Sequence, residues 1–452
     1  MEQFYLEKLT LRNYRRFSHK EFVLDKHMNV LIGSNASGKT TVLEAACVML
    51  GAYLAAYKKY VPSRFVFNIS EWDVHRKLQK KAQEDVLISP DIAQYPCVIG
   101  TSLVMDKTSF FYRRVLEKKD GRTKFDGNNP MQKQIITWEE MLGAADRSDK
   151  DVILPLVLYL SSARLWNEDK NSQKEENIPG RTDAYYRCLD KKRGTQFTFN
   201  YIKKLVEISV QEKNGVDFPA YTLIMDAIRR SVQDELKPKQ SIEYSSRYNG
   251  LALVESDGTW IPFDGLSDGY RGVIKIVADI ATRMCILNPY LKENILKETP
   301  GIVVIDELDL SLHPSWQRRI VKILTELFPK IQFICASHSP FIIQSLKEGQ
   351  LISMDGEIED VYSGQSIEDI AEDIMGIDNP QYSDEKREMM ELAEKYFSAL
   401  NSVNNEEELK GIRTKLDFLT ARFGDNPAYY AFLRQKYLEK ATEVGEKHAS
   451  DR

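Results

Sequence analysis

The sequence predicts an α/β protein with a mixed sheet and flanking helices, an antiparallel β lobe, and a helical module near its C-terminal end. The first observation is the apolar run Met28–Ile32, which leads through a glycine-rich turn into an apolar helix over residues 40 to about 57. The second is a pair of later apolar runs, Gly301–Ile305 and Ile331–Ala336, each followed by polar residues. Such short branched runs are typical of strands buried on both faces. The third is a change to charged, helical sequence after Ser383.

The antiparallel lobe is predicted from β-like runs in the first third of the chain. Residues 4 to 24 mix apolar and polar residues as strands do, and Cys97–Met105 and Ser109–Leu116 are two further runs of this kind. The turn at Asp120-Gly121 suggests hairpins. Further along, the long apolar run Val152–Leu160 indicates another buried strand.

The middle and later segments predict mainly helices. Residues 166–195 are polar and lack periodicity, so we expect an exposed insertion, and residues 197–236 read as helical. A hairpin is expected over Leu251–Phe263, because it turns at Asp257-Gly258. Helices then follow over about Asp268–Leu287 and over Pro314–Leu327.

The last part of the chain carries its own helical pattern. Apolar residues follow each other at spacings of three and four. They are Leu409, Ile412, Leu416, Leu419 and Phe423. We expect residues 1–375 to form the main domain, with an inserted helical region at about 165–245. Residues 380–445 would be a helical module for assembly or partner docking, and an ordinary bundle that caps the main domain is an equally good interpretation.

The composition bounds the class of protein. The 452 residues are 42% hydrophobic and 29% charged, which is ordinary for a globular protein. No stretch approaches the roughly 18 apolar residues of a membrane span, and the first residues lack a signal-peptide core, so we expect a cytoplasmic protein without a membrane partner. A net charge of −5 argues against a general nucleic-acid coat. The five cysteines are scattered and form no CxxC pair, which indicates neither zinc nor a disulfide framework.

The strongest chemical signal is a phosphate-binding loop between a predicted strand and a predicted helix. It matches G-x-x-x-x-G-K-[ST], in which backbone N–H groups wrap the phosphates and the helix N-terminus adds positive potential. Lys39 would reach the terminal phosphates and the Thr40 hydroxyl would bind Mg²⁺. The sequence therefore predicts ATP and Mg²⁺ as cofactors. The predicted ATP-binding residues are Gly33, Ser34, Asn35, Ala36, Ser37, Gly38, Lys39, Thr40 and Thr41.

Two carboxylates follow the apolar run Gly301–Ile305. Asp306 would bind Mg²⁺ together with Thr40, and Glu307 is placed to polarise an attacking water. Because adjacent strand residues point to opposite faces, the two acids need not share a role.

Two weaker signals complete the set. His338 follows the strand Ile331–Ala336 and would contact the γ-phosphate or the attacking water, although most lone histidines are structural. Ser267 precedes a long helix, so its hydroxyl and the helix N-terminal N–H groups would suit a terminal phosphate. Taken alone, this segment is better explained as an ordinary capped helix.

Together these segments resemble the ABC-type ATPases in order: phosphate loop, signature segment, acidic strand and histidine switch. The resemblance implies that the signature residues of one protomer, here Ser267 and Gly269, bind the γ-phosphate that the other protomer's phosphate loop holds. The segment Leu308–Pro314 matches the one that lies across that dimer interface. The resemblance to ABC-type ATPases also implies an ATP-dependent dimer or a higher homo-oligomer, with Glu307 and His338 as catalytic residues.

The opening Leu11–Phe17 is similar to the first strand of SMC- and RecF-type heads, in which the arginine of an Asn-aromatic-Arg triplet touches the nucleotide. That resemblance makes Arg15 an ATP-binding candidate. Asp268 replaces a glycine of the transporter signature, so its side chain must point away from the phosphate or meet a cation. The residues Ser161–Arg164, where a glutamine switch is expected, contain no glutamine.

The motifs Glu307–Pro314 and Ser337–Pro340 are typical of OLD-like ATPases of bacterial defence systems. The chain lacks the acidic pattern of a Toprim nuclease and the clustered histidines of an HNH nuclease. In the motif type of its ATPase segments and in its short helical C-terminal module, the chain resembles the PtuA family, the ATPase subunits of Septu-type anti-phage systems. That resemblance implies a separate, PtuB-like HNH nuclease partner under nucleotide control, with nucleic acid reached through the complex. The alternatives are a RecF-like DNA-repair ATPase that acts directly on DNA, and a non-hydrolysing assembly scaffold.

Overall fold

A computed structural model describes most of the chain. The described residues are 2–55, 67–78, 91–126, 140, 152–165, 180–192, 194–211, 219–356, 362, 364–377 and scattered positions beyond them. The chain divides into two compact units, Met1–Ile370 and Ala371–Arg452. Few positions of the second unit are described, and the predicted apolar stripe that begins at Leu409 lies outside the described residues.

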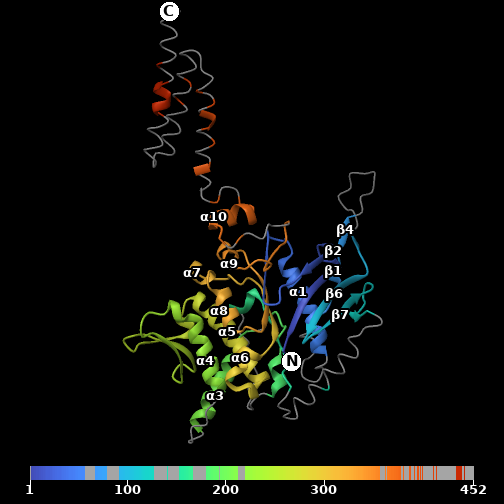
Figure 1. The fold of residues 1–452 in the computed structure, drawn as a ribbon, viewed down its shortest axis with the longest axis vertical. Coiled ribbons are helices and arrows are strands. Elements are labelled where there is room, and N and C mark those ends of the chain that lie inside the picture. Colours follow the sequence, from blue (N-terminus) through green and yellow to red (C-terminus); the bar gives the residue numbers. More distant parts are fainter. Residues whose placement is uncertain are drawn as a thin grey trace, which may run out of the picture. The chain divides into compact units, whose positions relative to one another are not determined.

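A five-stranded parallel sheet forms the centre of the first unit (Figure 1). Its strand order is β15-β3-β14-β13-β9, and every neighbouring pair runs parallel. The strands β3, β9, β13 and β14 are buried along their whole length, as their continuous apolar sequence predicts. The bounds are β3 (Met28–Ile32), β9 (Leu156–Leu160), β13 (Gly301–Ile305), β14 (Ile331–Ala336) and β15 (Leu351–Ser353).

An antiparallel sheet forms the predicted β lobe, with the order β2-β1-β6-β7-β8. Helix α1 (Lys39–Leu54) contacts strands of both sheets, and Figure 1 shows it beside the lobe strands. Every residue of α1 except Thr40 is buried, which explains its nearly uninterrupted apolar sequence. The lobe strands are β1 (Phe4–Tyr14), β2 (Phe17–Val23), β6 (Cys97–Met105), β7 (Thr108–Leu116) and β8 (Lys124–Phe125), beside a small pair β4 (Arg76–Leu78) and β5 (Asp91–Ala93).

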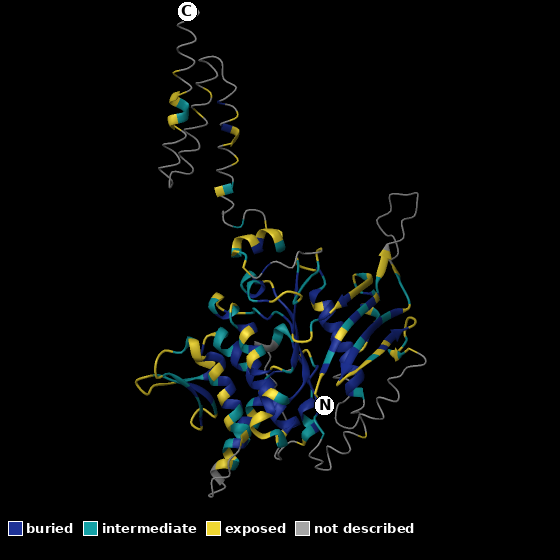
Figure 2. Ribbon diagram, viewed as in Figure 1, coloured by how far each residue is buried: buried dark blue, intermediate teal, exposed yellow. Residues whose placement is uncertain are grey.

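Four helices and a three-stranded sheet form a further part of the first unit, and Figure 2 shows buried residues along these helices. Helix α5 contacts α3, α4 and strand β9. Within α5 the fully buried Arg283 pairs with Asp279 at 2.9 Å, so a charge in the core has its counter-charge one turn away. These elements are α3 (Gln196–Gln211), α4 (Pro219–Val232), β10 (Ser241–Ser245), β11 (Gly250–Val254), β12 (Trp260–Pro262), α5 (Asp268–Leu287) and α6 (Ile295–Glu298).

Short helices complete the unit. They are α7 (Pro314–Gln317), α8 (Ile320–Leu327), α9 (Pro340–Gln344) and α10 (Ile367–Asp369). Within the described part of the chain, no helix has both the length and the apolar character that a membrane crossing requires.

The helical interpretation of residues 197–236 is confirmed by α3 and α4. Two other local predictions were wrong. The single helix expected over Pro314–Leu327 is two helices, α7 and α8. The described end of the supposedly exposed insertion, residues 180–192, is partly buried, because Tyr185 and Leu189 enter the core. Its polar composition comes from side chains such as Arg181, which donates to the Leu287 carbonyl at 2.6 Å.

Candidate nucleotide-binding site

The polar segments singled out in the sequence follow strands of the parallel sheet. The phosphate loop, residues 33–40, follows β3, while Asp306 follows β13 and His338 follows β14. Because parallel strands end at the same edge of a sheet, the three segments lie at one edge of the sheet. This edge is where α/β proteins place their ligands.

The phosphate loop holds Lys39 against its own backbone. The Lys39 ammonium donates to the carbonyls of Gly33 at 2.7 Å and Ser34 at 3.0 Å. Gly33 and Gly38 have φ values of 145° and 104°, which favour glycine. A Cβ at Gly33 would lie 2.8 Å from the Ser37 hydroxyl, so the loop is closed too tightly for any other residue there.

Two groups in the loop are suited to an anion. Burial lowers the pKa of Lys39, and the largest opposing effect on this pKa comes from the Asp355 carboxylate. The Ser37 hydroxyl is buried and has no hydrogen-bond partner among the described residues. A phosphate would neutralise the ammonium and accept from this hydroxyl, so the residues present fit a nucleotide phosphate chain.

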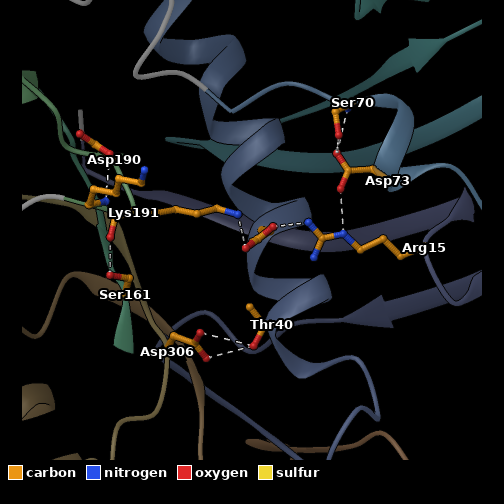
Figure 3. A network of polar contacts seen from close by, with 10 residues as sticks. Arg15, Thr40, Ser70, Asp73, Ser161, Asp190, Lys191 and Asp306 are labelled. Atoms are coloured by element: carbon orange, nitrogen blue, oxygen red, sulfur yellow. Dashed lines mark hydrogen bonds and ion pairs between the residues drawn. The ribbon is translucent and has the colours of Figure 1, made fainter. Parts of the chain in front are cut away.

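A candidate magnesium site lies at the start of α1 (Figure 3). The Thr40 hydroxyl is 3.4 Å from both carboxylate oxygens of Asp306. Neighbouring oxygen ligands of an octahedral Mg²⁺, each about 2.1 Å from the metal, lie roughly 3 Å apart. The hydroxyl and the carboxylate are therefore close to the spacing that would let them share such an ion.

The segments around the two predicted catalytic residues, Glu307 and His338, contact each other. Glu307 is half-buried and has a φ of 49°, which turns the chain sharply after β13. The His338 backbone N–H donates to Asp309 Oδ1 at 3.3 Å. The exposed His338 thus lies against the segment that begins with Glu307.

The signature segment lies at the N-terminus of α5. Ser267 is exposed at the N-cap position, and its side chain makes no capping hydrogen bond. Asp268 pairs with Arg271, so the acid that replaces a glycine does meet a cation, as its charge requires. A Cβ at Gly269 would lie 3.2 Å from the Ser311 carbonyl, which places the segment against the predicted interface segment.

Arg15 is held by two carboxylates. Its guanidinium pairs with Glu44 of α1 and, at 2.8 Å, with Asp73 (Figure 3). Lys191 also pairs with Glu44, at 2.5 Å. Arg15 therefore joins the β lobe to α1, and no contact between its guanidinium and the phosphate loop is seen among the described residues.

Two contacts with the phosphate loop were not predicted. Arg16 donates to the Ala36 carbonyl, and Asp355, just after β15, accepts from the Ser34 N–H and, at 3.2 Å, from its hydroxyl. Asp355 is far from the loop in sequence, and a second arginine beside the expected one carries no distinguishing pattern. Neither contact has a local sequence signal.

Two protein-family models match parts of the chain. A family model described as AAA domain matches residues 8–243, slightly more than half of the chain. A second AAA domain model, whose description refers to the AbiEii toxin of a type IV TA system, matches residues 155–344.

Several relatives are similar over part or most of their length. Retron Vc95 probable ATPase from Vibrio cholerae is 25% identical over 76% of this chain and 72% of its own. The Septu protein PtuA of Bacillus thuringiensis is 28% identical over 37% of this chain and 44% of its own. A RecF protein from Oceanobacillus iheyensis is 47% identical but over only 10% of this chain and 12% of its own. Among solved structures, the SMC head domain from Thermotoga maritima covers 77% of this chain and 94% of that one, at 12% identity and a TM-score of 0.41.

The central parallel sheet, the antiparallel lobe and the phosphate loop before α1 define an ABC/SMC-like ATPase. The chain belongs to the AAA domain family, whose model covers more than half of it, and it resembles the Septu protein PtuA.

Proposed function

We propose that this protein binds and hydrolyses Mg·ATP in a site that two copies of the chain complete together. The observation that carries the proposal is the convergence of Lys39, Thr40 and Asp306 at one edge of the sheet. Lys39 and the loop N–H groups would hold the phosphates, and Thr40 with Asp306 would hold Mg²⁺, which would neutralise charge on the phosphates when bound.

The second copy would supply what the first lacks. Ser267 presents a hydroxyl with no capping bond at the N-terminus of a 20-residue helix, where the backbone N–H groups favour a negative charge. Since Asp268 is held by Arg271, its charge is offset beside that position. Glu307 would accept a proton from the attacking water, and His338 would contact the γ-phosphate or that water.

We further propose that the protein is the ATPase subunit of an anti-phage defence complex in the cytoplasm. The similarity to a Septu PtuA and to a retron ATPase supports this assignment. Nucleotide state would control the assembly and activity of a partner HNH nuclease of the PtuB kind. The similarities to RecF proteins cover between 10% and 50% of this chain, less than the 76% covered by the similarity to the retron ATPase, so they give the RecF-like alternative less support.

The test is a mass measurement of the complex purified with the product of the neighbouring gene, with and without ATP. The proposal predicts that an HNH nuclease co-purifies and that its stoichiometry or its cleavage of DNA changes with nucleotide. A chain that purifies without a nuclease and binds DNA tightly and in a salt-sensitive way would instead support the RecF-like alternative.

A further inference from the structure

Two consecutive arginines form the turn between β1 and β2. Tyr14 and Phe17 pair across the hairpin, so Arg15 and Arg16 are its two turn residues. The turn is held in place, because the Arg15 N–H donates to the Asp73 carbonyl at 2.6 Å and its carbonyl contacts His75 Nδ1 at 2.6 Å. The backbone of the turn is therefore anchored to the segment Asp73–His75.

The two guanidinium groups differ in their partners. Arg15 is held between two carboxylates, those of Glu44 and Asp73, and its side chain is 28% exposed. Its charge is compensated inside the protein. A guanidinium that already pairs with two carboxylates would have to break those ion pairs to bind a ligand.

Arg16 is exposed and pairs with no carboxylate among the described residues. It donates to the Ala36 carbonyl, and its guanidinium lies 5.9 Å from the centre of the Phe17 ring. A Cβ on Gly38 would come within 2.8 Å of Arg16 Cδ. The arginine thus lies directly against the phosphate loop, on the residue that precedes Lys39.

Among the described residues, no carboxylate pairs with the remaining donors of Arg16. A guanidinium carries five N–H donors in a fixed plane, and phosphate oxygens match that plane better than any neutral acceptor. The Ala36 carbonyl and the Phe17 ring hold the group beside the loop without neutralising it. A phosphate bound in the loop would be an anion beside this guanidinium and would complete its hydrogen bonds.

We propose that Arg16 is a nucleotide-binding residue that contacts the phosphate chain, and that Arg15 is a positioning residue that fixes the lobe to α1. This inference rests on the proposed function, because it needs a nucleotide in the phosphate loop. It departs from the family resemblance, which gives the nucleotide contact to Arg15.

The experiment titrates the full-length protein with fluorescent ATP, ADP and adenosine analogues, and records thermal melting of each variant without nucleotide. The variants are Arg16→Gln, Arg15→Gln and, as a control for the loss of one charge, Arg12→Gln. Arg12 is exposed on β1 and makes no ion pair among the described residues. Arg16→Lys serves as a second variant, because it keeps the charge and loses the planar donors.

Arg16→Gln should weaken ATP and ADP binding about tenfold, leave adenosine binding unchanged and melt like the wild type. The affinity of Arg16→Lys for ATP and ADP should lie between those of Arg16→Gln and the wild type. Arg12→Gln should bind within about twofold of the wild type. Arg15→Gln should instead lower the melting temperature by several degrees, because Glu44 and Asp73 lose their shared partner.

The inference is overturned if Arg16→Gln and Arg16→Lys bind ATP as tightly as Arg12→Gln does. It is also overturned if Arg16→Gln weakens adenosine as much as ATP, since the loss would then be structural. If the wild type binds no ATP, or Lys39→Ala binds it equally well, the proposed function itself fails. Wild-type binding that depends on Lys39 but not on Arg16 would remove this inference alone.

Discussion

The phosphate loop and the signature segment, both predicted to contact the same nucleotide, are built very differently. In the loop, Lys39 is bonded to two carbonyls and Thr40 lies within 3.4 Å of Asp306, so its polar groups already face one another. In the signature segment, Ser267 is exposed and its side chain makes no capping bond. Under the proposed function, one chain would supply a preorganised phosphate and metal site, and the signature segment would meet its ligand only when a second chain is present.

The largest effect is expected at the preorganised half. Lys39→Ala should weaken ATP binding by about 100-fold or more, because a buried ammonium is the main positive charge in the loop. Calorimetric titration with Mg·ATP measures the change. ATP affinity equal to that of the wild type would contradict the assignment of the loop.

Glu307→Gln tests the chemistry without changing the loop. Turnover should fall by about 100-fold or more, because an amide cannot accept the proton of the attacking water. ATP binding should remain, so the variant should accumulate paired chains in ATP. Phosphate release measured at saturating ATP reports the loss, and turnover at the wild-type rate would remove Glu307 from its catalytic role.

Ser267→Arg sharpens the comparison by changing only the second half. The monomer should bind ATP within about twofold of the wild type, since Ser267 makes no contact with its own loop among the described residues. Hydrolysis should fall to background, because the arginine side chain would fill the place of the γ-phosphate contact. A variant that hydrolyses ATP normally would show that the signature segment takes no part.

The smallest expected effect is at Asp355. Asp355→Asn should strengthen ATP binding by about twofold to fivefold, because it removes a negative charge beside the loop and keeps an acceptor for Ser34. Salt should shrink the difference, since exposed charges are screened. Asp369→Asn, which changes an exposed acid in the cap of α10, is the matched control. Equal affinities of the Asp355 variant and this control at low salt would contradict the prediction.

Much of the fold was predictable because its signals are local. Four of the five parallel strands, and the helix after the phosphate loop, are mainly apolar segments whose order along the chain is visible in the sequence. Short strand β15 has no such run, with only three half-buried residues, and was not predicted. The N-cap position of Ser267 followed from its place before an apolar helix.

The parts that escaped prediction depend on contacts across the fold. Nothing local distinguishes Arg15, held by Glu44 and Asp73, from Arg16, which lies on the phosphate loop. Asp355 reaches Ser34 only because β15 pairs with β3. The burial of Tyr185 within a polar segment likewise depends on its hydrogen bonds to Tyr53 at 3.0 Å and to the Pro155 carbonyl at 2.7 Å.

The most direct measurement mixes two variants that are each expected to be inactive, Lys39→Ala and Ser267→Arg, and follows ATP hydrolysis. In a mixed pair, the intact loop of one chain would face the intact signature segment of the other. The arginine introduced at position 267 would face the loop of the Lys39→Ala chain, which is expected to hold no ATP, so it would displace no γ-phosphate there. The account predicts that mixing restores hydrolysis absent from either variant alone, rising as the two approach equal amounts. Activity that never exceeds the sum of the separate variants, at any ratio or concentration, would contradict a site shared between two chains.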